Sequence, residues 1–248
     1  MSEARFQYRL RVSRSARNIR LRVTIQRGLE VFVPRGYDET KVPALLERKK
    51  SWIRASLERV EARRKFFAPS PTWLLPTEIK LQALGLVWSI RKCESKAPHV
   101  AVREVQPSTL LVVGKLSDEA ACRAALNRWL MRQTRRYLVA RLNELSLRTH
   151  LSFKRVLVKK QRTRWASCSK RQTISLNANL LFLPPVLVDY VMIHELCHLS
   201  EMNHSEKFWS LVGHHYPDFR KRDSQLRDMW KRVPRWAASK IEPTARID

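Results

Sequence analysis

Three histidines and one glutamate late in the chain have the spacing of a metal site. The run His194-Glu195-Leu196-Cys197-His198 is followed six residues later by His204. Two histidines four residues apart lie on one face of a helix with their Cβ atoms roughly 6 Å apart, so both imidazoles can bind one small ion. A zinc ion with three protein ligands keeps a fourth position for water, which the carboxylate of Glu195 can deprotonate. The spacing therefore predicts a zinc hydrolase, most often a protease.

The segment around this motif has the composition of a buried helix. Residues 186–199 (VLVDYVMIHELCHL) are nearly all apolar and follow Pro184-Pro185, a permitted helix start. A buried helix rarely carries two histidines and a glutamate unless they pair or bind a metal. We therefore interpret both histidines as metal ligands and Glu195 as catalytic, whereas Cys197 faces away from the metal and packs in the core. The alternative is a helix with incidental surface histidines.

The third ligand is expected at the start of the next helix. Asn203, followed three residues later by Glu206, resembles a capping box with Asn203 as the N-cap. His204 would then lie in the first turn of this helix, where a tight reversal can bring it back over the first helix. His214 and His215 lie beyond it and are better explained as solvated histidines at a helix end.

Two supporting roles stay open at this point. A donor is needed to stabilise the oxyanion of a tetrahedral intermediate, and the candidates are Tyr216, His214 and His215. A carboxylate that orients a ligand histidine is also expected, and the candidates are Glu201, Asp189 and Asp218.

Cysteine use and the absence of targeting segments predict a soluble, cytoplasmic protein that does not enter a membrane. The four cysteines are scattered without a CxxC pair, which favours reduced intracellular thiols over a disulfide framework. The N-terminus has no apolar signal region, and no run of eighteen apolar residues occurs. No GxGxxG or GxxxxGK[ST] motif occurs, which argues against a glycine-rich cofactor loop.

The formal net charge of +27 indicates a possible polyanionic partner. Basic residues concentrate in segments 41–65, 154–171 and 220–240, and the last two also contain tryptophans. Basic patches with aromatic residues suit a nucleic-acid backbone and stacked bases. A solvated basic surface without a partner explains the same composition equally well.

Hydrophobic periodicity predicts an α+β fold. Period-two alternation predicts antiparallel strands within residues 4–34, and further strands in 78–114, near 153–160 and near 173–180. Helical spacing predicts a helix from about Asp38, a long helix over 117–146 and the two helices of the metal site.

We expect the chain to divide near residue 115. Residues 1–115 would form an antiparallel β-rich part with one helix, and residues 116–240 would carry the metal site. The last residues, 241–248, are expected to form a frayed tail.

Several motifs resemble those of the YgjP-like zinc metallopeptidases, a family related in its core to the SprT-like metalloproteases. The specific ones are RTRWASCS (162–169), ISLNANLLFLPPVLVDYVMIHELCHL (174–199) and NHSEKFWSLV (203–212), and softer ones are SRSARNIRLRV (13–23) and VPRGY (33–37). The family's usual W-G-S-C stands here as Trp165-Ala166-Ser167-Cys168. The resemblance implies a zincin-like helix and sheet domain with an HExxH helix. It also implies that His194, His198 and His204 bind one Zn²⁺ and that Glu195 is the catalytic acid and base.

The resemblance further implies how a protein or peptide substrate would bind. The strand near 173–180 would lie beside the active-site helix, where an extended substrate adds along a sheet edge. Asn177 and Asn179 would then lie near the cleft. The alternative is that they are polar residues on the exposed face of a strand.

The leading hypothesis is a zinc-dependent metallopeptidase that hydrolyses peptide bonds through a zinc-activated water, with Glu195 as general base and acid. The alternatives are a nucleic-acid-binding protein with a structural or vestigial zinc site, a protease acting on nucleic-acid-associated proteins, and a zinc hydrolase acting on another kind of bond. Glu195 favours catalysis, because structural zinc sites are usually closed by a fourth Cys or His.

Overall fold

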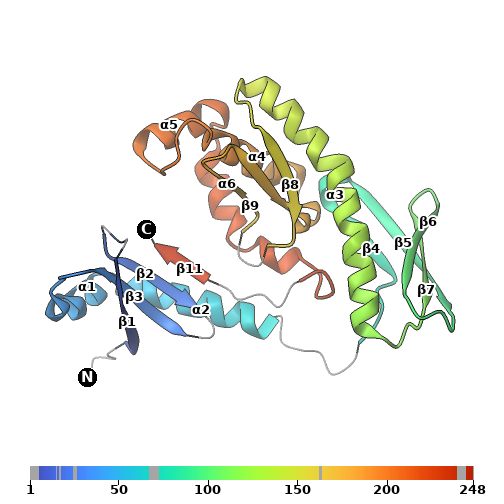
Figure 1. The fold of residues 1–248 in the computed structure, drawn as a ribbon, viewed down its shortest axis with the longest axis horizontal. Coiled ribbons are helices and arrows are strands. Elements are labelled where there is room, and N and C mark those ends of the chain that lie inside the picture. Colours follow the sequence, from blue (N-terminus) through green and yellow to red (C-terminus); the bar gives the residue numbers. More distant parts are fainter. Residues whose placement is uncertain are drawn as a thin grey trace. The chain divides into compact units, whose positions relative to one another are not determined.

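The computed structural model describes residues 6–14, 16, 18–24, 27–66, 73–161, 164–238 and 244–247. The chain divides into two compact units, residues 1–69 with 240–248 and residues 70–239. Both units combine strands and helices, which confirms the predicted α+β class (Figure 1). Among the described helices, none is both long and apolar enough to cross a membrane.

The first unit is a four-stranded sheet with helices packed on one face. Its elements are β1 (Tyr8–Ser13), β2 (Arg20–Thr24), β3 (Gly28–Pro34), a 3-10 helix (Glu39–Lys41), α1 (Val42–Arg48), α2 (Lys50–Phe66) and β11 (Thr244–Ile247). The sheet order is β1-β3-β2-β11. β2 is antiparallel to β3 and β11, whereas β1 is parallel to β3. The expectation of antiparallel strands throughout residues 4–34 is therefore wrong for β1, because β2 and β3 pair with each other and β1 takes the other edge of β3.

Alternate positions of the strands form the core of this unit together with the helices. The buried apolar residues are Leu21, Val23, Leu29, Val31, Val33, Val42, Leu46, Ile53 and Val60. The helical segment begins at Asp38 as predicted, because this carboxylate accepts a hydrogen bond from the backbone N–H of Thr40 at 3.1 Å. Lys49 interrupts the segment and separates α1 from α2. β11 lies in the segment expected to be frayed, and its backbone partner is the distant strand β2.

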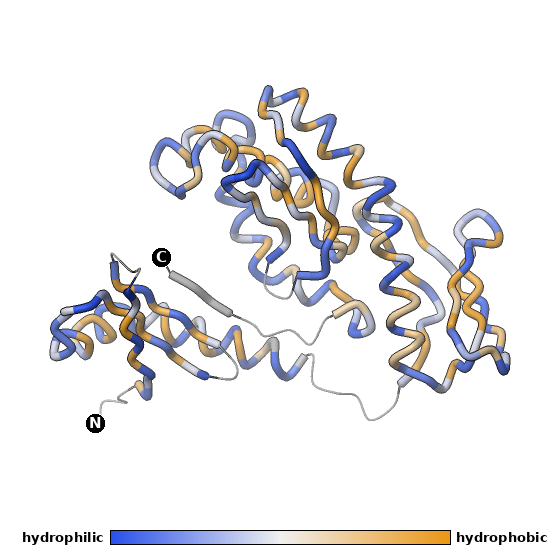
Figure 2. The backbone as a smooth tube through the Cα atoms, viewed as in Figure 1, coloured by the Kyte–Doolittle hydropathy of each residue, from blue (hydrophilic) through white to orange (hydrophobic). Residues whose placement is uncertain are grey.

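The second unit begins with another four-stranded sheet. It contains β4 (Glu78–Leu81), a 3-10 helix (Gln82–Leu84), β5 (Leu86–Glu94), β6 (Ala101–Gln106) and β7 (Thr109–Gly114), in the order β4-β5-β7-β6. The long helix α3 (Glu119–Thr149) follows, and its N-cap Asp118 accepts a hydrogen bond from the N–H of Ala121 at 2.9 Å. Buried residues recur along α3 at the intervals of three and four that are typical of a helix. Figure 2 shows polar and apolar stretches following one another along α3.

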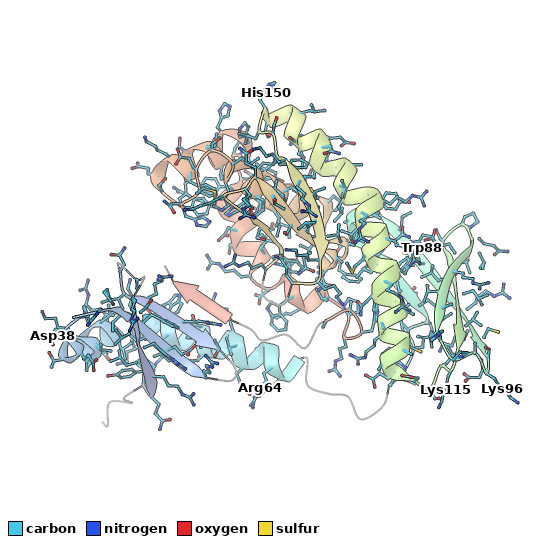
Figure 3. All side chains as sticks on the ribbon, in the orientation of Figure 1. Asp38, Arg64, Trp88, Lys96, Lys115 and His150 are labelled. Carbon is cyan, nitrogen blue, oxygen red and sulfur yellow. The ribbon has the colours of Figure 1, made fainter. Side chains whose placement is uncertain are left out.

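Helix α3 packs on this sheet and also on the elements that carry the metal site. On the sheet side, Trp129 meets Trp88 of β5 edge to face, with ring centroids 5.5 Å apart. Figure 3 labels Trp88, which lies beside α3. On the other side, α3 contacts β8 and α4, and one hydrophobic cluster includes all of these elements. The structural division therefore lies at residues 69/70 and differs from the division expected near 115. The apolar face of strands 78–114 is buried by a helix that comes later in the chain.

A three-stranded sheet precedes the helices of the site. The remaining elements are β8 (Arg155–Lys159), β9 (Ala166–Cys168), β10 (Thr173–Asn177), a 3-10 helix (Ala178–Phe182), α4 (Pro185–Cys197), α5 (Glu206–His215), α6 (Phe219–Leu226) and a 3-10 helix (Met229–Arg232). β10 is the central strand, parallel to β8 and antiparallel to β9. The short strand β9 was not predicted, because three residues are too few for a periodic signal. β9 forms the sheet edge that contacts α4.

Gly114 at the end of β7 provides a test of the second unit's packing. Its φ is +136°, and an added Cβ would lie 2.7 Å from the carbonyl oxygen of His99 and 2.9 Å from the Cα of Val100. We expect Gly114→Ala to lower the free energy of unfolding by roughly 2–4 kcal/mol, because backbone strain and a backbone clash both contribute.

Gly85→Ala is the matched control, because Gly85 has a φ of +64° but nothing within 4 Å of an added Cβ. This substitution should cost about 1–2 kcal/mol from the left-handed backbone alone. Chemical denaturation of the two variants measures the difference, and equal losses would contradict the clash at Gly114.

Candidate metal centre

Helix α4 supplies two of the site residues in its last turn. Pro185 is in its first turn, where a missing backbone N–H costs nothing, and most of its side chains are buried. The helix ends at Cys197, and His198 is the C-cap with φ −66° and ψ −12°. His194 and Glu195 therefore project from the helix itself. Cys197 is fully buried, as its position away from the metal face predicts.

The loop between α4 and α5 differs from its predicted form. Helix α5 begins at Glu206, and its N-cap is Ser205, whose hydroxyl accepts a hydrogen bond from the N–H of Phe208 at 3.4 Å. The expectation that Asn203 is the N-cap is wrong, because the carbonyl of Asn203 instead accepts a hydrogen bond from the N–H of Ser205 at 2.8 Å. His204 consequently lies in the loop before the helix and not in its first turn.

The structure brings the three predicted ligands together. One ring nitrogen from each of His194, His198 and His204 lies within 4.8 Å of the others. The Nε2 atoms of His194 and His204 are 3.2 Å apart. His198 is buried, His194 is partly exposed and His204 is exposed, so the cluster has one side open to solvent.

Phe208 of α5 contacts all three histidine rings. Its ring centroid is 4.4 Å from that of His198, 4.8 Å from that of His204 and 4.9 Å from that of His194. The side chain is fully buried. The sequence indicated Phe208 only as the start of a new apolar period. The signal for its role is that it follows His204 by four residues.

A backbone carbonyl orients one of the ligands. The Nδ1 atom of His198 is 3.0 Å from the carbonyl oxygen of Glu201, so Nδ1–H donates to it and Nε2 is left for a metal. The other two carboxylates that were candidates for this role are engaged elsewhere. Asp189 forms a bidentate ion pair with Arg141, with N···O distances of 2.9 and 2.7 Å. Asp218 forms an ion pair with Arg222 at 3.2 Å.

Burial favours the neutral form of His194 and His198 by lowering the pKa of each. It is the main cause that lowers the pKa of His194 to about 3, and the nearby His198 and His204 lower it further. Burial also lowers the pKa of His198, although the hydrogen bond to the Glu201 carbonyl opposes this. Neutral imidazoles at neutral pH have the free lone pairs that metal binding requires.

Glu195 lies between the histidines and the edge strand β9. Its residue is 8% exposed, and this burial raises the pKa of its carboxyl to about 7. The carboxylate accepts a hydrogen bond from the backbone N–H of Cys168, which opposes the rise, as does the positive charge of Arg164. Sequence reasoning missed Cys168 as a neighbour of Glu195, because β9 is 27 residues earlier in the chain.

The motif residues of β9 and β10 have mainly structural roles. Ala166, at the position of the family's usual glycine, lies in a regular strand and is not among the described residues with positive φ. Asn177 is buried, and its amide donates to the carbonyls of Gln161 and Arg164 at 2.8 and 2.7 Å. Asn179 is also buried, which excludes the alternative of an exposed polar strand face.

The candidate oxyanion donors are not part of the histidine cluster. His214 and His215 contact each other at the end of α5. The hydroxyl of Tyr216 donates to the carbonyl of Val186 at 2.9 Å. Tyr190 stands between Tyr216 and the site, with its ring centroid 5.7 Å from Tyr216 and 6.1 Å from His194.

The two tyrosines give contrasting predictions for stability. The Tyr190 hydroxyl is buried without a hydrogen-bond partner among the described residues. Tyr190→Phe should therefore leave the free energy of unfolding unchanged or raise it by about 1 kcal/mol. Tyr216→Phe should lower it by about 1 kcal/mol, because it removes the bond to Val186. Thermal unfolding compares the variants, and a loss in Tyr190→Phe larger than in Tyr216→Phe would contradict the assignment.

The comparisons with solved structures and with curated proteins give no assignment of this chain. One solved structure that matches is the crystal structure of the metallopeptidase zymogen of abylysin from Pyrococcus abyssi, with 25% identity over 34% of this chain and 87% of that one, at a TM-score of 0.32. A TM-score of this size is too low to relate the two folds. None of the curated proteins matches the chain.

The family model provides the assignment, because its match extends over most of the sequence. The model described as "YgjP-like, metallopeptidase domain" matches residues 17–229. This range includes strands of the first unit, the histidine cluster and the elements between them. The chain belongs to the YgjP-like metallopeptidase family.

Proposed function

We propose that this protein is a zinc-dependent peptidase in which His194, His198 and His204 hold one zinc ion and Glu195 is the general base and acid. The observation that carries the proposal is the convergence of three imidazoles beside a buried carboxylate, in a chain of a metallopeptidase family. Helix α4 would contribute one ligand, His194, together with the acid Glu195, and its C-cap His198 would be the second ligand, as expected of a zincin-like catalytic helix.

The donor set fits zinc in number and spacing. Tetrahedral zinc with Zn–N bonds of about 2.05 Å places its ligand nitrogens roughly 3.4 Å apart. The Nε2 atoms of His194 and His204 are 3.2 Å apart, and the third nitrogen lies within 4.8 Å of both. Three protein ligands and an open side are typical of catalytic zinc, whereas structural sites are closed by a fourth ligand.

Glu195 is the buried carboxylate that would transfer protons at this site. A bound zinc ion would supply Lewis acidity, which makes water a better nucleophile and polarises the scissile carbonyl. Glu195 would accept the proton of that water and then donate it to the leaving amine. The N–H of Cys168 holds the carboxylate against β9 and so limits the positions it can adopt.

We further propose that an extended substrate adds to β9, and not to the strand at 173–180 as expected from sequence. β10 is the central strand, so both of its edges are occupied. On β9, the carbonyl of Trp165 and the N–H of Ser169 bond to β10 at 2.9 and 3.1 Å. The backbone groups of Ala166 and Cys168 therefore face the other way. Because the N–H of Cys168 bonds to Glu195, the N–H and carbonyl of Ala166 and the carbonyl of Cys168 would pair with the substrate. A peptide pairing there would lie beside α4.

Removal of a ligand tests the metal assignment. His198→Ala should reduce bound zinc from one ion per chain to near zero. Its zinc affinity should fall by more than about 100-fold, which is the upper range for substitutions of residues that only orient a ligand. His214→Ala should keep the ion, because His214 lies outside the cluster. Elemental analysis measures the zinc content of each variant, and titration against a zinc chelator measures its zinc affinity. Equal zinc content in the two variants would contradict the ligand set.

Removal of the base tests catalysis separately from binding. Glu195→Gln should retain zinc but lower the rate of peptide hydrolysis by about 10²–10⁴-fold, the range for general acid–base catalysis. Glu201→Gln is the control, because His198 uses only the backbone carbonyl of that residue. The readout is digestion of a peptide library by each variant and the parent. The role of Glu195 would be refuted if its variant cleaved a sensitive peptide at the parental rate.

A further inference from the structure

The N-terminal part of the chain contains an unusual arginine pattern. Residues 5–27 include eight arginines and neither an acidic residue nor a lysine. In β1 and β2 the arginines alternate with apolar residues, in the sequences YRLRVS and RLRVT. Alternate residues of a strand point to opposite faces. The arginines of each strand therefore share the face opposite the core.

The strand registers bring these arginines to one surface. They align four arginines with two residues of β3: Arg9 and Arg22 with Glu30, and Arg11 and Arg20 with Phe32. Their neighbours Leu21, Val23, Leu29 and Val31 point the other way and pack against the helices. Within the described residues of this unit, α1 and α2 thus cover the core face. We name the opposite surface, formed by Arg9, Arg11, Arg20, Arg22, Arg27, Glu30 and Phe32, the arginine face.

Glu30 is a buried carboxylate at the centre of the arginine face. Its side chain is 0% exposed, and its Oε1 lies 3.5 Å from Arg11 Nε and 3.7 Å from Arg27 Nη1. Two arginines thus lie within ion-pair distance of Glu30, although neither carboxylate oxygen accepts a hydrogen bond from the described residues. The side chains of the two arginines remain 48% and 53% exposed. Because a guanidinium has five N–H donors, both retain donors for another acceptor.

The five arginines exceed the single carboxylate by four positive charges. Arg9 and Arg20 are exposed, Arg22 is partly exposed, and Phe32 presents a partly exposed ring among them. Guanidinium groups bind phosphate oxygens in pairs of parallel hydrogen bonds, and aromatic rings stack on bases. We propose that the arginine face binds the sugar–phosphate backbone of a single-stranded nucleic acid, with Phe32 stacking on a base.

The composition of the arginine face favours a nucleic acid over a membrane surface as its partner. A membrane-binding surface combines cations with exposed, large apolar side chains. Phe32 is the one large apolar residue at the described positions of the arginine face, and it is flanked by arginines. The segments 41–65, 154–171 and 220–240, which the charge pattern first indicated, lie outside this surface.

The test compares two variants that lose equal charge from the full-length protein. Arg9→Gln/Arg20→Gln/Arg22→Gln leaves the ion pairs of Glu30 with Arg11 and Arg27 in place. Arg48→Gln/Arg54→Gln/Lys65→Gln removes three charges from exposed positions of α1 and α2. Fluorescence anisotropy of a labelled strand of about 20 nucleotides, longer than the site of one small binding fold, gives the affinity. The measurement is repeated between about 50 and 200 mM salt. It gives the salt slope, which is the change in the logarithm of the affinity with the logarithm of the salt concentration.

We expect the arginine-face variant to lose at least about tenfold in affinity and its salt slope to fall by about 2, the value for three phosphate contacts on a single strand. The helix variant should change by less than about threefold. Phe32→Leu should weaken binding about tenfold with the slope unchanged, because stacking involves no counterion. Glu195→Gln should bind like the parent, so failure of the proposed peptidase activity would not affect this result.

Several results would overturn the proposal. These are absence of binding by the parent, equal losses in the two charge variants, and equal affinity for a duplex of the same sequence. Arginine-dependent binding to phosphatidylserine vesicles but not to oligonucleotides would identify a membrane surface instead. If circular dichroism shows that the glutamine variant does not fold, the binding test uses two other variants in its place. These are Arg9→Lys/Arg20→Lys/Arg22→Lys and Phe32→Leu. The lysine variant should keep the slope but lose affinity, because lysine cannot form paired hydrogen bonds.

Discussion

The near-complete burial of helix α4 is the constraint on which the site depends. An apolar helix surrounded by α3, β9, α5 and α6 has no room for unpaired charge. Its polar groups are therefore accommodated individually: His194 and His198 are neutral, and Glu195 accepts the N–H of Cys168. The same burial that would penalise these groups in isolation makes their nitrogens available to a metal and holds the carboxylate next to them.

The surrounding structure fixes the geometry through backbone groups and aromatic packing more than through charged partners. A carbonyl orients His198, and Phe208 lies against all three imidazoles. Neither partner of these imidazoles, a backbone carbonyl and a phenyl ring, is itself titratable. Two of the carboxylates that could have performed the same task form ion pairs with arginines instead, Asp189 with Arg141 and Asp218 with Arg222.

The two units of the chain show opposite uses of a sheet. In the second unit, both the sheet β4–β7 and the sheet β8–β10 contribute to one hydrophobic cluster around α3 and α4. In the first unit, helices cover one face only, and the other face is built from arginines around a single buried carboxylate. The large positive charge of the chain is thus partly organised by strand register, which composition alone does not reveal.

Local patterns in the sequence determined the candidate ligands, the apolar helix at 185–197 and the α+β class, because residue spacing along a helix or strand decides which side chains share a face. Tertiary structure alone decided which distant elements meet. The pairing of β1 with β3, the burial of strands 78–114 by α3 and the contact of β9 with Glu195 join residues far apart in sequence. The sequence also could not predict that Ser205 is the N-cap of α5. Asn203 and Ser205 have similar capping propensities, so the packing of the loop decides between them. Short-range periodicity carries no information about which elements pair or which residue caps a helix, because these features depend on long-range packing.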